Sequence, residues 1–144
     1  GGTAQFNFVQ QNAGNPVLVD GGTLTDVGTY NQTGGNVTVQ NGGRINSQTF
    51  TQAADTVWAS GGTLSVTSYN ANGGATKISN DGTVSVSSGN LALGPSTTFI
   101  IQDSVSSLNL TDVNAGELQP RGGTIAVSGV TLNIRLISFN IRPE

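Results

Sequence analysis

The sequence predicts an all-β chain wound into a parallel β-helix, or β-solenoid, with rungs of about 20 residues. A short phrase, consisting of a polar residue, a glycine pair and a Thr, recurs at nearly constant spacing. The apolar residues between copies of the phrase fall into columns that repeat with the same spacing. No stretch carries apolar residues at helical spacing over two turns, and glycine and β-branched residues are frequent, which favours short strands.

The recurring phrase fixes the period. Its clearest copies are 20–24 (Asp-Gly-Gly-Thr-Leu), 60–64 (Ser-Gly-Gly-Thr-Leu) and 121–125 (Arg-Gly-Gly-Thr-Ile), with partial copies at 1–3, 41–43 and 81–84. The second glycines of the first five copies are at positions 2, 22, 43, 62 and 82, so the steps are 20, 21, 19 and 20 residues. We interpret each glycine pair as a corner where the backbone needs positive φ.

Two apolar columns indicate how the rungs stack. One contains the aromatic residues Tyr30, Phe50 and Tyr69, and the other contains Leu24, Ile45, Leu64 and Val84. Each unit then has about three strand segments, and only a stack of units can bury the apolar face. A third column, of Thr23, Thr63 and Thr83, predicts a Thr ladder that Arg44 interrupts. In the first unit the alternation of Phe6, Asn7 and Phe8 predicts that both rings face one side of a strand, which suits a partly capped end.

Composition excludes several classes of function. The 144-residue chain has the length of one domain, and its five basic residues are scattered, so we expect no nucleic-acid partner. It contains no Cys and no His, the usual ligands of zinc, copper and haem, so we expect no cofactor and no metal. No apolar run approaches the ~18 residues that span a bilayer. The absence of an initiator Met indicates a processed chain or an excised segment.

The period weakens in the last third of the chain. We predict solenoid repeats over 1–104, an irregular rung or connection over 105–120, and C-terminal capping or assembly strands over 121–144. The tail alternates apolar and polar residues and shifts parity at 136–137, where we expect a bulge. We expect this tail either to cap the solenoid or close its side, or to pair with a neighbouring subunit. The candidate assembly residues are Val130, Leu132, Ile134, Leu136, Ile137, Phe139 and Ile141.

The repeats resemble those of a known family. Gly-Gly-Thr-Leu, then an aromatic residue with Asn or Gln, then Gly-Gly-x-Val-x-Val, is similar to the repeats of bacterial autotransporter and filamentous-haemagglutinin-type passengers. Residues 1 to about 104 carry the resemblance, and 121–128 echo it. The resemblance implies a right-handed parallel β-helix at the cell surface that acts as an adhesin or stalk. It carries over no functional residue.

No catalytic pattern is present, and we predict that the protein is not an enzyme. Acidic residues are spread along the chain and are interpreted as solvated turn residues; Asp20 and Asp81 occupy equivalent corners but are several rungs apart. Nucleophilic catalysis by Ser or Thr needs a base such as His, which the chain lacks. The glycine- and aspartate-rich calcium repeat is also absent.

Two functions remain. The first is a non-catalytic structural protein of an extracellular or cell-surface assembly, such as a filament, sheath or surface layer, whose partner is itself through strand pairing. The alternative is an adhesin or fibre stalk that binds surface carbohydrate, with the single tryptophan, Trp58, as ligand contact if it lies outside the core. Three sites match the N-glycosylation pattern, at Asn31, Asn36 and Asn109, and the sequence leaves their modification open.

Overall fold

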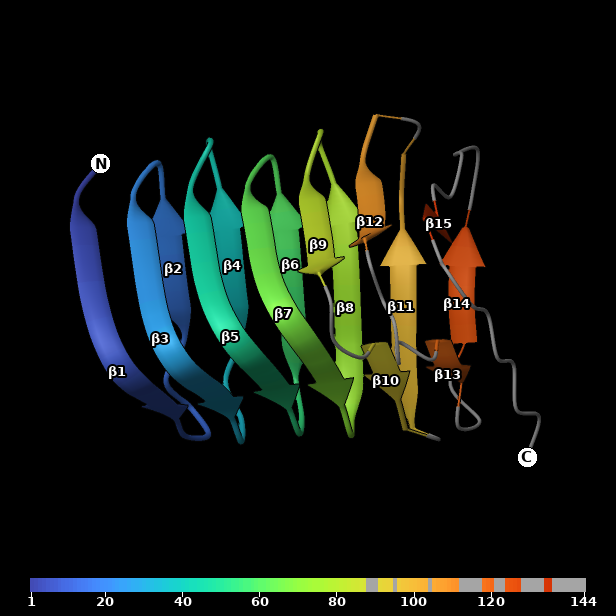
Figure 1. The fold of residues 1–144 in the computed structure, drawn as a ribbon, viewed down its shortest axis with the longest axis horizontal. Helices are drawn as coiled ribbons and strands as arrows, with labels where there is room; N and C mark the ends of the chain where they lie inside the picture. Colours follow the sequence, from blue (N-terminus) through green and yellow to red (C-terminus); the bar gives the residue numbers. More distant parts are fainter. Residues whose placement is uncertain are drawn as a thin grey trace.

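The structure, a computed structural model, is a parallel β-solenoid of about five turns, here called rungs (Figure 1). It describes residues 1–87, 91–94, 96–103, 105–111, 118–120, 124–127 and 134–135. These residues form strands and turns, with no helix among them, and every strand pairing is parallel. The predicted fold class is therefore confirmed.

The strands form two sheets, one behind the other in Figure 1. The nine-stranded sheet contains β1 (Thr3–Gln11), β3 (Thr23–Gln32), β5 (Arg44–Gln52), β7 (Thr63–Ala71), β9 (Thr83–Ser87), β10 (Leu91–Leu93), β12 (Ser107–Thr111), β13 (Leu118–Pro120) and β15 (Ile134–Arg135). The six-stranded sheet contains β2 (Val17–Asp20), β4 (Val37–Gln40), β6 (Thr56–Ser60), β8 (Gly74–Ser79), β11 (Thr97–Ile101) and β14 (Thr124–Val127).

The long strands of the larger sheet bend, so two of the three segments expected per rung are joined in one element. The bend coincides with a register shift between β3 and β5, after Asp26 and before Thr29. Asp26 pairs with Ser47 and Thr29 pairs with Thr49, so two residues of β3 lie opposite a single residue of β5. This extra residue makes a β-bulge. Past β7 the strand divides: β9 pairs with the first half of β7 and β10 with the second.

The two predicted apolar columns pack in the core, which also contains buried residues of the smaller sheet such as Val39 and Ile78. The paired residues Leu24, Ile45, Leu64 and Val84 make up the first column. In the second, the rings of Tyr30 and Phe50 stack with centroids 4.7 Å apart, and those of Phe50 and Tyr69 with centroids 5.2 Å apart. All three rings are fully buried, and they run as a spine along the solenoid axis.

The two glycines of each corner are required for different reasons. The predicted need for positive φ applies only to the first glycine. The first glycine does adopt positive φ, 63° at Gly21 and 71° at Gly61. The second does not; instead a Cβ at Gly62 would lie 2.6 Å from the carbonyl carbon of Val39 in the preceding rung. A rung can stack this closely at the corner only where no side chain intervenes.

The corners come in two lengths, which explains the variable step. The corners that connect Val39 to Arg44 and Ile78 to Thr83 each contain one residue more than the equivalent corners of the alternate rungs, at 19–23 and 59–63. Each longer corner contains two consecutive positive-φ residues, at 41–42 and 80–81. Asn and Asp tolerate this conformation better than other side chains, so Asp81 can stand where other copies have glycine.

Strand pairing continues beyond residue 104. β12 pairs with β9, β13 with β10, β14 with β11 and β15 with β12, so each joins the stack in the order of the chain. The step from Thr83 to Ser107 is 24 residues, longer than the earlier ones. The division into 1–104, 105–120 and 121–144 stays a prediction.

Candidate functional site

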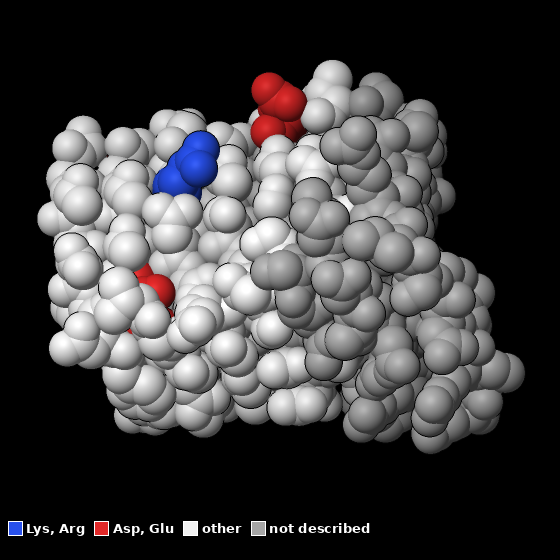
Figure 2. Space-filling view, in the orientation of Figure 1, with Lys and Arg blue, Asp and Glu red and all other residues white. Residues whose placement is uncertain are grey.

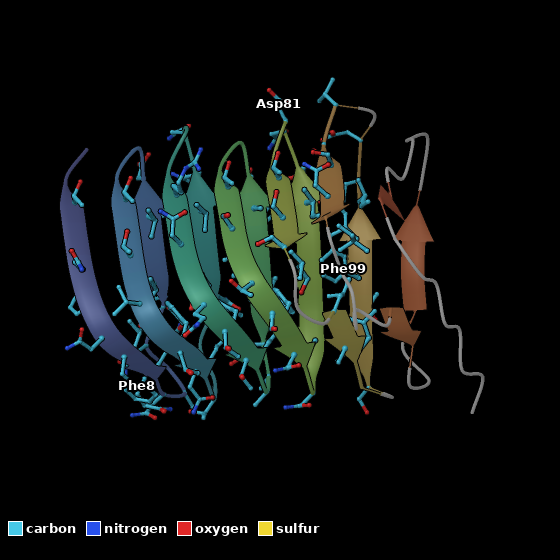
Figure 3. The ribbon with its side chains drawn as sticks, in the orientation of Figure 1. Phe8, Asp81 and Phe99 are labelled. Atoms are coloured by element: carbon cyan, nitrogen blue, oxygen red, sulfur yellow. The ribbon has the colours of Figure 1, made fainter. Side chains whose placement is uncertain are left out.

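The described surface carries little charge. Figure 2 shows one face almost entirely without charged groups in its described part. Asp20, Asp55 and Asp81 are exposed at corners, as expected, and Figure 3 shows Asp81 at the tip of its turn. No group of three or more His, Cys, Asp or Glu residues that could hold a metal ion occurs among the described residues. The same part of the chain contains no helix long and apolar enough to cross a membrane.

Asp26 is an exception to the prediction of solvated acidic residues. Its side chain is only 2% exposed and lies at the bend of β3. The carboxylate accepts hydrogen bonds from the Gly28 amide (3.0 Å) and from the Ser47 hydroxyl of the next rung (3.1 Å). Both bonds hold the bulge in place, so Asp26 is a structural residue. The sequence signal that could have identified it is its position in the column that continues with Ser47 and with the apolar residues Val66 and Val86.

Buried glutamines connect the rungs at the opposite corner. The Gln52 side chain is fully buried, and its carbonyl accepts hydrogen bonds from the hydroxyls of Tyr69 and Thr76, both at 3.0 Å. Its amide donates to the Ala75 carbonyl at 2.9 Å. Two rungs earlier, the side-chain carbonyl of Gln11 accepts a hydrogen bond from the Tyr30 hydroxyl at 2.9 Å. Burial raises the pKa of both tyrosine hydroxyls well above the ordinary value, so they remain donors in the core.

The glutamine between these two, Gln32, lacks the same partners. Its amide donates to the Gly35 carbonyl, but its carbonyl oxygen has no hydrogen-bond partner. The positions that hold hydroxyls around Gln52 are occupied here by Phe50 and Val57. An unpaired buried carbonyl is destabilising by about 1–3 kcal/mol. The Gln32 site is therefore the weakest of the three junctions.

Trp58 lies on the outer face of the smaller sheet. It projects from β6 between the buried residues Val57 and Ala59, and 39% of it is exposed. Its indole N–H donates a 2.7 Å hydrogen bond to the Ser79 hydroxyl on β8, which fixes the ring across the neighbouring strand. The ring borders a groove of about 430 Å³, here called the Trp58 groove, lined by Asn36, Val37, Thr38, Thr56, Trp58, Lys77 and Gln102.

The first rung presents the interior of the solenoid to its surroundings. Phe6 pairs in register with the buried residue Asp26, so it belongs to an inward column, yet it is 46% exposed. Phe8 pairs with half-buried Thr29, is 56% exposed and lies near the C-terminal end of β1 in Figure 3. The prediction that both rings face one side is wrong because the bend of the strand shifts the parity between them.

The edges of both sheets are unpaired at this end. β1 pairs only with β3 and β2 only with β4 among the described strands. A shallow pocket of about 340 Å³ lies beside them, bordered by Ala4, Leu18 and Leu24 together with the corner residues of the first two rungs. We call β1 and β2, with Phe6, Phe8 and Leu18, the open end.

Of the predicted assembly residues, Ile134 lies within the described chain. It forms part of β15 and pairs in register with Leu110 of β12. The other six lie outside the described residues: Val130, Leu132, Leu136, Ile137, Phe139 and Ile141. Sequence reasoning proposed Trp58 and the tail as sites. It did not predict the exposure of Phe6 at the start of a buried column, or the polar residues around Trp58, since these emerge only from the register.

Comparison with protein-family models, with curated proteins and with solved structures finds no match to this chain. The chain is a β-helix repeat protein by its fold.

Proposed function

We propose that this protein is a non-catalytic structural component of an extracellular or cell-surface assembly, joined to further copies of itself by strand pairing at the ends of the solenoid. The observation that supports the proposal most strongly is the open end. Among the described strands, both of its edge strands are paired on one side only, and it exposes Phe6, whose column is buried in the following rungs at Asp26, Ser47 and Val66. Such an edge pairs readily with another strand.

The strand that meets this edge is, in our proposal, the apolar C-terminal tail of a second copy. Stacking there would continue the parallel ladder and bury Phe6 and its column as an interior rung does. The residues from Val130 to Ile141 have the alternating apolar pattern such a strand needs. A head-to-tail contact of this kind, which does not close on itself, generates a filament.

The resemblance of the repeats to those of autotransporter and haemagglutinin-type passengers supports placement at the cell surface. Low charge, the absence of Cys and the Thr column, interrupted at Arg44, are compatible with a rigid surface fibre. Because those passengers act as stalks or adhesins, the resemblance favours a structural role over catalysis.

Electron microscopy and sedimentation of the full chain test the proposal. We expect filaments or a series of oligomers that shortens in the variant Phe6→Lys/Phe8→Lys and in a chain lacking residues 130–144. Both phenylalanines are exposed in the single chain, so the double variant should retain the far-ultraviolet circular dichroism of the parent protein. Trp58→Ser is the matched control, since it removes an exposed aromatic residue from the flank.

A parent chain that stays monomeric at high concentration would overturn the proposal. So would assembly that survives both the double substitution and the deletion unchanged.

A further inference from the structure

Beyond self-assembly, we propose that the Trp58 groove binds a glycan, with a carboxylate-bearing sugar ring seated on the indole. The proposal is independent of the assembly at the solenoid ends, because the groove lies on the flank of the smaller sheet, on β4, β6 and β8. It rests on the aromatic surface, on a set of unpaired polar groups around it, and on one cation.

The indole is held in the orientation that a sugar ring needs. The hydrogen bond from Trp58 to Ser79 immobilises the ring, yet more than a third of the side chain stays accessible to solvent. The apolar C–H face of a pyranose packs on such a ring, while its hydroxyls reach sideways to polar neighbours. A fixed aromatic side chain loses little conformational entropy when the ligand binds.

The polar groups that border the ring are available. The side-chain carbonyl of Asn36 accepts a 3.1 Å hydrogen bond from the Thr56 amide, which leaves the Asn36 amide group to donate outwards. The hydroxyls of Thr38 and Thr56 and the amide of Gln102 form no side-chain hydrogen bond within the described part of the protein. This is a mixed set of neutral donors and acceptors, as sugar hydroxyls require.

Lys77 determines the charge of the proposed ligand. It pairs in register with Trp58, so its stem lies beside the indole, and it forms no ion pair with a described residue. The lining of the groove, as far as the described residues form it, contains no Asp or Glu. An ammonium in a groove whose described lining holds no carboxylate favours an anionic group, and the flexible lysine stem can reach a carboxylate at the rim of the sugar ring.

A peptide strand fits the groove less well. The strands beneath it, β4, β6 and β8, are paired on both sides, so none has a free backbone edge for strand addition. An apolar helix would find one aromatic ring surrounded by hydroxyls, amides and an ammonium. The residues therefore favour a carbohydrate over a polypeptide.

Fluorescence titration tests the proposal directly, because Trp58 is the only tryptophan of the chain. The probes are a short β-1,4-linked glucuronic acid oligomer and the matched neutral glucose oligomer, which differ in the carboxylate. Measurements use dilute protein at low ionic strength. We expect a saturable change in emission with the acidic oligomer and at least about tenfold weaker binding of the neutral one, the effect of losing about 1.4 kcal/mol.

Two cation variants make the test selective. Lys77→Gln should abolish the preference for the acidic oligomer, while Arg44→Gln, which removes an exposed cation from the other sheet, should preserve it. Trp58→Ala should abolish binding of both oligomers, measured by calorimetry, with unchanged circular dichroism.

No emission change with either oligomer would overturn the proposal. Equal affinity for the two oligomers, or equal effects of Lys77→Gln and Arg44→Gln, would overturn the assignment of a carboxylate to Lys77.

Discussion

The first rung and the interior rungs contain equivalent parallel strands, but among the described strands those of the first rung are paired on one side only. Phe6 of the first rung occupies the column that contains Asp26 and Val66 in later rungs. The later residues are 2% exposed, whereas Phe6 is 46% exposed. The difference shows that burial in this fold is a property of a rung's neighbours. A rung completes its core only when another rung covers it on each side.

A matched pair of phenylalanine truncations should separate the two environments most clearly. Phe50→Ala removes a fully buried ring from the aromatic spine, so we expect a loss of about 3–5 kcal/mol in the free energy of unfolding. Phe6→Ala, measured on dilute protein, should cost less than about 1 kcal/mol, because its ring is half exposed. Chemical denaturation measures both. Similar losses at the two positions would contradict the distinction between the end and the interior.

The same comparison applies to the corner glycines. A Cβ at Gly82 would lie 2.1 Å from the carbonyl oxygen of Ala59, whereas one at Gly2 would have no atom within 4 Å. We therefore expect Gly82→Ala to destabilise the protein by about 1–3 kcal/mol, as overpacking does, and Gly2→Ala to be nearly neutral. Thermal unfolding of the two variants provides the measurement. A neutral Gly82→Ala would show that the corners do not need close stacking.

A substitution at the Gln32 junction should change the free energy of unfolding by less than Phe50→Ala or Gly82→Ala does, and should increase it. Phe50→Tyr places a hydroxyl where Tyr69 has one in the next rung, within reach of the unpaired Gln32 carbonyl. We expect the free energy of unfolding to rise by about 1 kcal/mol. In a Gln32→Leu background the gain should vanish, because the hydroxyl then lacks its acceptor. A gain that persists in that background would assign the stabilisation to another cause.

The sequence predicted the solenoid and its core columns because the fold repeats one simple pattern. Residues 20 positions apart must stack, so Tyr30, Phe50 and the Leu24 column could be aligned without coordinates. The bends and corners were less predictable. The buried position of Asp26 depends on a one-residue bulge, and the second glycine of each pair depends on the carbonyl of a different rung.

The candidate sites were predicted only in outline. Trp58 stood out as the sole tryptophan, but its location outside the core required the register of β6. Asn36, Lys77 and Gln102 come from three different rungs, and no local motif joins them. The open end likewise became visible only when the exposure of Phe6 was compared with that of its column.

Amide hydrogen exchange as a function of protein concentration tests directly whether the open end is an assembly surface. We expect β1 amides to exchange rapidly in dilute solution and to become protected as the protein concentration rises, while β5 amides are protected throughout. The Phe6→Lys/Phe8→Lys variant should lose this dependence. Exchange in β1 that does not change with protein concentration would show that the open end is not an assembly surface.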